Sequence, residues 1–580
     1  MVELKHLNKY FLKYKFKIII GIFITIIARI FALITPNLIG DSITIIENYI
    51  STSSMDIEVM KSKLLTNILI IVGSAIIAGI FTFIMRQMLI NVSRFIEFDL
   101  KNEIYNKYQF LSFDFYKNNR TGDLMNRISE DVSKVRMYIG PAIMYTINTF
   151  SLFLIVITYM ISVAPKLTMY TLLPLPVLSF IIYKISIIIN FKSKIVQEYL
   201  SKLTTYTQES FSGVKIIKTY NIEENINKEL NKLADTSRSK NMSLVKIQAW
   251  FFPLMILLIG ISNILVVFIG GRQYMNNEIE LGILAEFIIY VNMLTWPVAT
   301  VGWVTSIVQQ AEASQKRINE FLSVQTTVKN ISNKKIEIKG KIEFKNIEFI
   351  YPETKIKALK NVSFSLNKGN SLAIMGDIGS GKTTILELLC RIYDPMKGKI
   401  LIDDFNIKKI NIEDLRNSIG YVPQSTFLFS ETINKNIKFG NENASKNEVK
   451  DAAKEVCLSN EIKLFKNGYN TLLGERGVNL SGGQKQRLTI ARAIIKKPKI
   501  LILDDSLSAV DTETEEIILS NINKVSKDIT LLIATHRIST AKNCNKILVL
   551  ENGKVIECGS HKELIRKNGY YAHTVLKQSK

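Results

Sequence analysis

Long uncharged runs occupy most of residues 1–310, whereas residues 341–580 alternate between short apolar stretches and polar segments. A helix needs about 20 apolar residues to cross a bilayer. Six runs reach that length, namely 18–39, 64–90, 137–164, 167–191, 247–271 and 281–310. Lipid cannot satisfy an open backbone, so each run is expected to be helical. The pattern predicts six membrane-spanning helices followed by a water-soluble domain.

Positive charges are unevenly divided between the connecting segments. Segments 1–17, 91–136 and 192–246 hold 23 Lys and Arg residues, whereas segments 40–63, 165–166 and 272–280 hold four. Segments rich in Lys and Arg stay in the cytoplasm. This predicts a protein of the inner (cytoplasmic) membrane with its N-terminus, C-terminus and soluble domain in the cytoplasm. No small-residue cleavage site follows the first run, so we expect this run to be a retained anchor.

The two longest inner segments have mixed charge and lack dense Gly and Pro clusters, so they are expected to continue the spans as helices. Each contains one break, at 112–118 and at 209–214. Either break would form the tip of a helical hairpin, where a membrane domain can touch a cytoplasmic one. An ordinary polar turn is the alternative interpretation.

Four charged residues lie inside the predicted spans. Arg86 and Lys184 are near the cytoplasmic ends, where long side chains reach the headgroups. Arg29 lies deeper in the first span, and Glu286 lies near the outer end of the sixth. An ionisable group inside a span is a functional candidate. Whether Arg29 and Glu286 line a substrate path stays open.

The net charge of +23 permits two interpretations. A basic protein can bind nucleic acid, but no basic run here interleaves with aromatic residues. Lysine-rich cytoplasmic segments of a membrane protein explain the charge better, so no nucleic-acid partner is expected. The four cysteines, Cys390, Cys457, Cys544 and Cys558, show no CxxC spacing, which indicates neither a disulfide framework nor a zinc site.

The soluble half contains a complete phosphate-binding motif between a predicted strand, 371–375, and a predicted helix that starts around Thr384. The motif G-x-x-x-x-G-K-[ST] is formed by Gly376, Asp377, Ile378, Gly379, Ser380, Gly381, Lys382 and Thr383. Strand, glycine-rich loop and helix N-terminus together form an anion cradle. Lys382 is expected to neutralise the β- and γ-phosphates of a bound nucleotide, and the Thr383 hydroxyl to bind Mg²⁺.

Two further motifs fit the same chemistry. The apolar run 500–503 predicts a buried strand that ends at Asp504, whose carboxylate would hold Mg²⁺. Asp505 follows and is placed to polarise an attacking water. Between the motifs stands the string Leu480, Ser481, Gly482, Gly483 and Gln484. Ser481 is a good helix cap, and the two glycines allow an anion to approach the backbone.

Together these motifs make the chain resemble an ATP-binding cassette (ABC) exporter half-transporter of the bacterial multidrug and lipid exporter type, over nearly its whole length. The resemblance implies an α-helical six-span transmembrane domain (1–321), a linker (322–340) and an α/β P-loop ATPase domain (341–580). It implies ATP and Mg²⁺ as cofactors and a second half-transporter as partner. The tips at 112–118 and 209–214 would be coupling helices.

The resemblance also assigns individual residues. Residues Leu480–Gln484 would be the signature motif that closes over ATP held by the partner subunit. Tyr351 would stack on adenine, Gln424 would contact Mg²⁺, and His536 would contact the γ-phosphate. Residues 474–477 would form the exporter-specific loop. The dimer-interface loop would be formed by Ser508, Ala509, Val510 and Asp511.

One position departs from the family pattern. Asp505 stands where the family usually has glutamate, and its shorter side chain leaves the carboxylate about 1–1.5 Å short of a water placed for glutamate. Either aspartate still works there, or the chain carries the slow site of a heterodimeric exporter. We favour the heterodimer, since the signature motif of this chain is intact.

The sequence therefore predicts ATP-driven export of a hydrophobic or amphipathic substrate, a drug or a lipid, by alternating access. An importer on the same architecture, a peptide exporter, and a soluble ATPase acting on DNA or ribosomes are the alternatives. The last leaves six spans unexplained.

Overall fold

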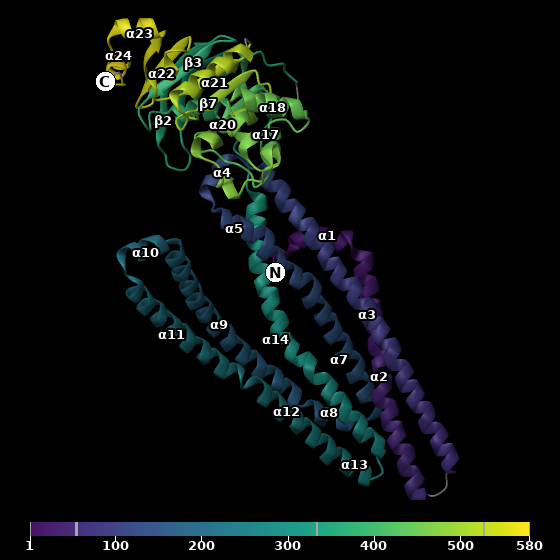
Figure 1. Ribbon diagram of the computed structural model, residues 1–580. Helices are drawn as coiled ribbons and strands as arrows, with labels where there is room; N and C mark the ends of the chain where they lie inside the picture. The colour runs from purple at the N-terminus through teal and green to yellow at the C-terminus, as the bar shows by residue number, and fades with distance from the viewer. Residues whose placement is uncertain (1, 53–55, 332–334, 526–527, 579–580) are drawn as a thin grey trace. The chain divides into compact units, whose positions relative to one another are not determined.

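The computed structural model describes residues 2–52, 56–331, 335–525 and 528–578 (Figure 1). The chain forms two compact units. The first, called the helical unit here, comprises Met1–Gln109 and Gly122–Val324. The second, called the sheet unit, comprises Gln325–Lys580 together with the short segment Phe110–Thr121.

Within the described residues, six helical stretches of the helical unit are long and apolar enough to cross a membrane. This confirms the prediction of six apolar helices, and each predicted run falls within one stretch to within a residue. The α-helices are α1 (Asn8–Lys13), α2 (Lys15–Thr52), α3 (Ile57–Phe110), α5 (Thr121–Asn126), α6 (Val132–Met137), α7 (Ile143–Val163), α8 (Pro165–Leu172), α9 (Pro174–Ser212), α10 (Val214–Tyr220), α11 (Glu223–Gln248), α12 (Phe251–Leu265), α13 (Gly271–Met275) and α14 (Leu281–Ser323). A 3₁₀ turn, η1 (Glu3–Leu7), precedes them, and π-helical turns η2 (Arg127–Asp131), η3 (Tyr138–Ala142) and η4 (Val266–Gly270) interrupt them.

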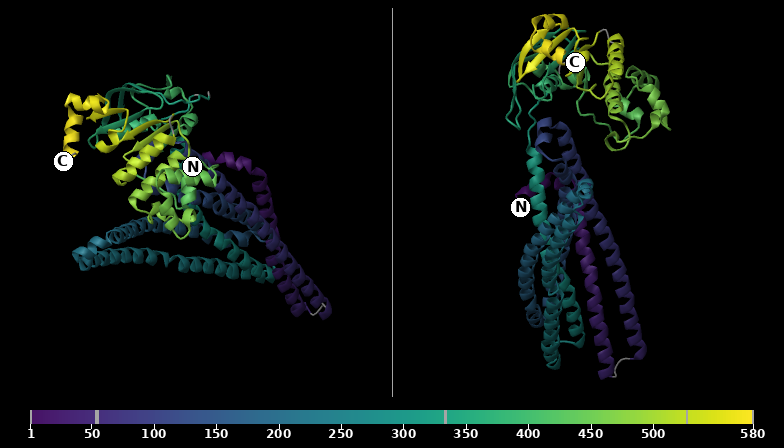
Figure 2. Two further views of the ribbon diagram at one scale, coloured as in Figure 1. Left: turned by 45° about the horizontal axis from the view of Figure 1, so that its top comes forward. Right: turned by 60° about the vertical axis from the view of Figure 1, so that its left-hand side comes forward.

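Helix α14 is the centre of the packing in this unit, with α2, α6, α7 and α9 against it. At its N-terminal end the backbones of α14 and α2 approach closely, since a Cβ on Gly282 would lie 2.0 Å from the Gly40 carbonyl oxygen. Small residues at such crossings let helices pack tightly in a membrane. Helices α9 and α11 run side by side in all views of Figures 1 and 2.

The helices extend well beyond the apolar runs, as the mixed-charge segments predict. Helix α3 continues to Phe110, and the first tip is the short helix α4 (Phe113–Asn118). The second tip lies later than predicted. The chain stays helical through 209–212 because the amide of Gly213 still donates to the Glu209 carbonyl (2.8 Å), and the turn spans Gly213, α10 and the left-handed Asn221 (φ 54°).

The sheet unit contains two sheets, ordered β2-β1-β4-β5 and β10-β9-β3-β8-β7-β6. The first is antiparallel, with β1 (Ile342–Ile350), β2 (Lys357–Leu366), β4 (Lys397–Ile402) and β5 (Phe405–Asn406). The second consists of β3 (Ser371–Gly376), β6 (Ile419–Val422), β7 (Ile500–Asp504), β8 (Thr530–Ala534), β9 (Lys546–Glu551) and β10 (Lys554–Gly559). It is parallel except for the β9–β10 pair.

Helices cover this second sheet, and apolar side chains of its strands enter two hydrophobic clusters. Strand β7 is fully buried and alternates between them, with Leu501 and Leu503 in one and Ile500 and Ile502 in the other. The helices are α15 (Lys382–Leu389), α16 (Ile412–Asn417), α17 (Ile433–Lys438), α18 (Lys446–Glu455), α19 (Ser459–Leu464), α20 (Gly482–Ile494), α21 (Thr512–Val525), α22 (Ile538–Ala541), α23 (His561–Lys567) and α24 (Tyr570–Gln578), with 3₁₀ turns η5 (Ile407–Lys409), η6 (Gly468–Asn470) and η7 (Glu475–Gly477). These elements confirm the predicted α/β domain behind the six-helix region.

Candidate nucleotide site

Four neighbouring parallel strands deliver the motif residues to one edge of the six-stranded sheet. In spatial order β3 leads into the glycine-rich loop, β8 into His536, β7 ends at Asp504, and β6 leads towards Gln424. Ligands of open parallel sheets bind at the carboxyl ends of the strands. The fold therefore gathers at this edge motif residues that lie far apart in the sequence.

The glycine-rich loop requires its glycines for steric reasons. Gly376 has φ 147°, and a Cβ there would lie 2.2 Å from the Leu550 carbonyl oxygen. Gly381 has φ 103°, and a Cβ there would lie 2.8 Å from the Ala358 carbonyl oxygen. The loop ends at α15, so the first amides of that helix point to the loop, where an anion is favoured.

Lys382, the first residue of α15, bonds back to the start of the loop. Its ammonium group donates to the carbonyl oxygens of Gly376 (2.7 Å) and Asp377 (2.8 Å). Burial lowers the pKa of Lys382, and the nearby carboxylates of Asp505 and Asp504 oppose this shift. A lysine ammonium held at this position can bind a phosphate group as a point charge.

Thr383 and Asp504 face each other across the loop. The Thr383 hydroxyl donates to Asp504 Oδ1 (3.2 Å), and Asp504 is only 2% exposed. Its second oxygen, Oδ2, has no hydrogen-bond partner among the described residues. Burial raises the pKa of Asp504 to about 6, although the Thr383 hydroxyl favours the ionised form. A buried carboxylate oxygen without a partner next to a hydroxyl fits a hard divalent cation.

Asp505 is held by its backbone as well as by its side chain. Its amide donates to the Ala534 carbonyl oxygen (2.9 Å) and it takes the left-handed conformation (φ 45°), which is uncommon for a residue other than glycine. Asp505 Oδ1 lies 3.1 Å from His536 Nδ1. Gln424 is exposed in the loop after β6. The structure therefore brings Asp505 and His536 into direct contact.

Tyr351 lies beside the end of the loop. Its hydroxyl contacts Thr384 Oγ1 (2.9 Å) and donates to the Glu387 carboxylate (3.0 Å). Its ring meets those of Phe349 and Tyr393 edge-on. Burial raises the pKa of Tyr351 well above its usual range. The ring is thus fixed close to the phosphate-binding loop.

The string Leu480–Gln484 forms the start of α20. Ser481 caps the helix, since its hydroxyl accepts from the Gln484 amide (3.3 Å) while the Gln484 side chain accepts from the Ser481 amide (2.9 Å). Gly483 lies close to the loop 508–511, because a Cβ on it would be 2.9 Å from the Ala509 carbonyl oxygen. Within the described part of the chain, no hydrogen bond joins this string to the glycine-rich loop. The described hydrogen bonds of this string therefore leave it unconnected to the glycine-rich loop of the same chain.

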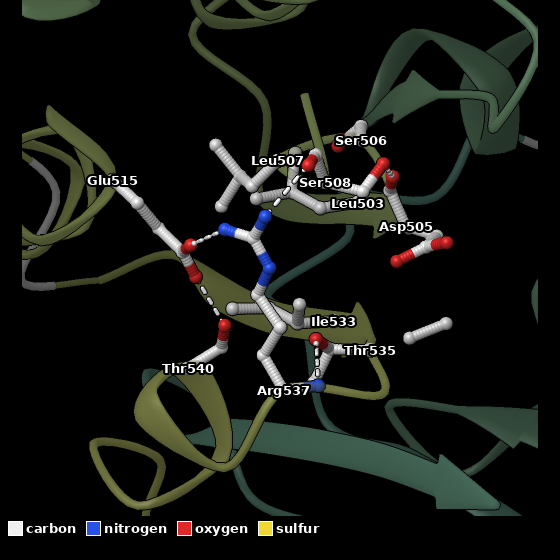
Figure 3. A pocket seen from close by; sticks show the side chains of 11 residues that line it. Leu503, Asp505, Ser506, Leu507, Ser508, Glu515, Ile533, Thr535, Arg537 and Thr540 are labelled. Atoms are coloured by element: carbon white, nitrogen blue, oxygen red, sulfur yellow. Dashed lines mark hydrogen bonds and ion pairs between the residues drawn. The ribbon is translucent and has the colours of Figure 1, made fainter. Parts of the chain in front are cut away.

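Arg537 holds the loop 508–511 through hydrogen bonds, and it lies below Ser508 in the view of Figure 3. Its guanidinium donates to the carbonyl oxygens of Ser508 (2.6 Å) and Val510 (3.1 Å) and to the Glu515 carboxylate (2.7 Å). Glu515 is 1% exposed and also accepts from Thr540. This pair, in which Glu515 is buried and Arg537 half-buried, fixes the loop that neighbours both Asp505 and the start of α20.

Sequence reasoning assigned no role to several residues that the structure places here. Arg537 and Glu515 are two of them. Gln486, whose Oε1 accepts a hydrogen bond from the Ala509 amide (2.9 Å), is a third. Glu387 and the tip residue Lys117 both contact Tyr351. Arg537 follows His536 directly, so adjacency to a motif was the available signal for it. Glu515 carries no such signal, and Lys117 was marked only as part of the predicted tip 112–118.

The two intramembrane candidates are engaged inside the helical unit. Arg29 Nε donates to Asn148 Oδ1 (2.6 Å). Glu286 is 4% exposed, and its carboxylate accepts hydrogen bonds from the Tyr290 hydroxyl (2.8 Å) and from the side-chain amide of Asn37 (3.4 Å). Their place on a substrate path stays a prediction.

Comparison with known proteins adds independent findings. The family profile described as ABC transporter transmembrane region matches residues 18–298, and the profile described as ABC transporter matches residues 359–508. The chain is 37% identical over 586 residues to the multidrug resistance-like ATP-binding protein MdlA of Buchnera aphidicola subsp. Baizongia pistaciae, which covers 100% of this chain and 99% of that protein. It is 34% identical over 577 residues to the probable multidrug resistance ABC transporter ATP-binding/permease protein YheI of Bacillus subtilis, which covers 98% of this chain and 96% of that one.

Among solved structures, the fold is similar to that of a bacterial Atm1-family ABC exporter with ATP bound. The TM-score is 0.81, the sequence identity is 24%, and the match covers 99% of both chains. At this identity the similarity establishes the fold.

Proposed function

The chain belongs to the ABC transporter family, and we propose that it is one half of a dimeric, ATP-driven exporter. The observation that carries the proposal is the joining of two parts in one chain. Six apolar helices precede an ATPase domain whose motif residues meet at the carboxyl edge of one sheet. The domain bounds proposed are 1–321 for the transmembrane domain, 322–340 for the linker and 341–580 for the ATPase domain.

Each motif has a proposed role in binding ATP. The loop from Gly376 to Thr383 cradles the phosphates through its amides, and Thr384 completes the contact at the start of α15. Lys382 neutralises the β- and γ-phosphates, for which it must leave the loop carbonyls it now bonds. Tyr351 offers its ring to adenine. The fixed position of that ring close to Thr384 supports this role.

The residues present fit a magnesium ion. Thr383, Asp504 and Gln424 would hold it. Asp504 Oδ2, which has no hydrogen-bond partner in the described part of the chain, supports this assignment. When bound, Mg²⁺ neutralises charge that develops on the phosphates. Asp504 serves this role in its ionised form, which the Thr383 hydroxyl favours.

Asp505 and His536 form the proposed hydrolytic pair. Asp505 accepts a proton from the attacking water, and His536 holds the Asp505 carboxylate and reaches the γ-phosphate. Their 3.1 Å contact supports a joint role. Gln424 is proposed to orient the same water from the β6 side.

A complete site requires a second subunit. Leu480–Gln484 makes no hydrogen bond to its own phosphate loop in the described chain, and the exposed Ser481 and Gly482 are free to cover nucleotide held by a partner. The loop Ser508–Asp511 lies beside Gly483 and would cross the same interface. ATP bound between two such surfaces would favour the closed dimer, which is a population shift.

The partner is proposed to be a different half-transporter. Asp505 has a shorter reach than the glutamate usual in the family, and its carboxylate is already bonded to His536. The site of this chain would hydrolyse slowly, whereas its intact signature string would complete a faster site on the partner.

The substrate is proposed to be a hydrophobic or amphipathic drug or lipid that leaves the cell by alternating access. The names of the relatives, which refer to multidrug resistance, support this class. The orientation supported by the positive charges places both termini and the ATPase domain in the cytoplasm. The tips at α4 and Gly213–Ile222 would carry the motion of the ATPase domains into the membrane.

Transport into inside-out vesicles tests the function. Vesicles from cells that produce the chain and its partner should accumulate a fluorescent hydrophobic cation when ATP is added, and vesicles with Lys382→Ala should accumulate less. Lys368→Ala, an exposed lysine outside the site, is the matched control. Equal uptake with and without ATP would refute export of this class. The mass of the gently extracted complex then separates a homodimer of 66.0 kDa chains from a heterodimer.

A further inference from the structure

The N-terminal segment Asn8–Ile19, called the elbow here, is clamped to helix α3. The Lys9 ammonium lies 2.6 Å from Glu103 Oε1, and the Lys13 ammonium lies 2.6 Å from Asp99 Oδ2. Helix α1 ends at Lys13, Tyr14 follows outside the helical conformation (φ −108°, ψ 15°), and α2 begins at Lys15. The elbow therefore holds a fixed bend next to α3.

A cavity of about 410 Å³ lies beside this bend. This volume is within the range of pockets that hold small organic ligands. Four parts of the helical unit line it, with Phe11, Leu12, Lys15, Ile18 and Ile19 from the elbow, Leu89 and Val92 from α3, Tyr138 and Ile139 from η3, and Ile143 from α7. The π-helical turn η3 forms one wall, and such turns often occur at functional sites. Apart from Lys15 and the Tyr138 hydroxyl, the lining side chains are apolar.

Lys15 brings a positive charge to the lining of the cavity. Among the described residues, no carboxylate lies within 4.0 Å of the Lys15 ammonium, whose nearest aromatic contact is Phe16 (5.3 Å from its ring centre). On the neighbouring stretch of α3 and α6, Arg94, Lys101 and Arg136 all pair with the single carboxylate of Glu97. Three cations on one anion leave an excess of positive charge on this stretch of α3 and α6. Arg94 and Arg136 each lie two residues along the chain from a lining residue, Val92 and Tyr138 respectively.

The cavity belongs to the end of the helices that leads into the sheet unit. Helix α3 runs on from Leu89 and Val92 to Phe110, which is the first residue of the sheet unit's segment Phe110–Thr121. Under the topology proposed above, this end faces the cytoplasm. The cavity then lies at the inner leaflet, where anionic headgroups meet basic side chains.

We propose that this cavity binds one molecule of an anionic phospholipid from the inner leaflet. An acyl chain fills the apolar space between the elbow, α3 and η3, and the phosphate pairs with Lys15. Leu12 and Ile19, which are 68% and 59% exposed, would cover the remainder of that chain. The inference rests on the proposed orientation but not on the transported substrate or on ATP hydrolysis.

Native mass spectrometry of the purified complex, titrated with phosphatidylglycerol or phosphatidylcholine, tests the site. Wild-type protein should bind one phosphatidylglycerol per chain more tightly than phosphatidylcholine. Lys15→Gln should weaken phosphatidylglycerol binding about fivefold, the contribution of one lysine near an anionic surface. Lys5→Gln removes an equal, exposed charge that does not line the cavity and should change little. Equal losses in both variants would mean diffuse attraction and would overturn the proposal.

A second pair of variants tests the cavity itself. Ile19→Trp should fill the space and abolish retention of the lipid, whereas Ile20→Trp, on the next exposed position outside the cavity, should not. Both positions are exposed, so neither change enlarges a packed core. Retention unchanged by Ile19→Trp would mean that the lipid only surrounds the helices, which would refute the site. ATP hydrolysis measured on the same samples tests the proposed function separately.

Discussion

The ammonium nitrogen of Lys117, at the first helical tip, lies 4.9 Å from the centre of the Tyr351 ring. It also lies 5.3 Å from the ring centres of Tyr393 and Phe113. Lys117 draws the nearby Glu387 carboxyl towards its ionised form, against the burial that raises the pKa of that group. Because the Tyr351 hydroxyl contacts Thr384 and Glu387, a short chain of contacts links the tip to the start of α15.

Replacing Lys117 should therefore weaken nucleotide binding although the residue lies outside the phosphate loop. An exposed cation such as Lys117 over an aromatic ring contributes about 0.5–1 kcal/mol. Lys117→Gln should raise the dissociation constant for ATP about two- to fivefold, because the Tyr351 ring loses a contact that fixes its position. Binding of fluorescent ATP analogues to the full-length protein measures the effect.

Arg120→Gln is the matched control for charge, since Arg120 is an exposed residue two positions after the end of α4. Tripolyphosphate, which has no base, should bind equally to Lys117→Gln and to the wild type. A loss of tripolyphosphate affinity as large as the loss of ATP affinity would show that Lys117 does not act through the Tyr351 ring.

Asp505→Glu should raise ATP hydrolysis at the site of this chain. The longer side chain extends the carboxylate by about 1–1.5 Å, and misplacement on that scale can cost about a hundredfold in rate. We expect an increase of up to about that size, measured as phosphate release per chain by the purified complex. Asp505→Asn, which keeps the length and removes the base, should lower the rate. An unchanged or lower rate with glutamate would contradict the short-reach explanation.

Lys382→Ala should weaken ATP binding about ten- to hundredfold, the loss expected when a charged hydrogen-bond donor is removed. The fold should survive, because among the described residues the Lys382 side chain donates hydrogen bonds to just two carbonyl oxygens, both of its own loop. Titration with a fluorescent ATP analogue measures the affinity, and Lys368→Ala should bind as the wild type does. If Lys382→Ala binds nucleotide normally, the phosphate-loop assignment is wrong.

The sequence predicted those parts of the site that are short continuous motifs at the ends of strands. Gly376–Thr383, Asp504 and His536 each follow a buried parallel strand, and the carboxyl ends of neighbouring parallel strands meet at one edge. The six spans were also predictable from contiguous sequence, since a chain that crosses lipid has few alternatives to a helix.

Contacts between elements were not predictable in the same way. Glu515 is an ordinary polar position in the first turn of α21, and only packing reveals that it is buried against Arg537. Lys117 falls in the predicted tip 112–118, but the sequence does not reveal its contact with Tyr351. The second tip was placed too early because 209–212 looks like a polar turn, yet its backbone continues the helix until Gly213.

The Arg537–Glu515 pair makes a prediction about stability and activity together. Arg537→Met would leave Glu515, which is 1% exposed, without its cation, and breaking a buried pair in this way costs about 3 kcal/mol. The same change removes two donors from the carbonyl oxygens of Ser508 and Val510, so the interface loop should lose its position. Thermal unfolding of the purified complex should therefore begin at a lower temperature, and ATP hydrolysis should fall.

A second variant separates these two effects. In Arg537→Met combined with Glu515→Gln, the neutral amide no longer needs a cation and can still bond Thr540, the existing partner of Glu515. Most of the lost thermal stability should return, whereas ATP hydrolysis should stay low because the loop Ser508–Val510 still lacks its two donors. Recovery of hydrolysis together with stability would show that Arg537 serves the fold alone and does not position the interface loop.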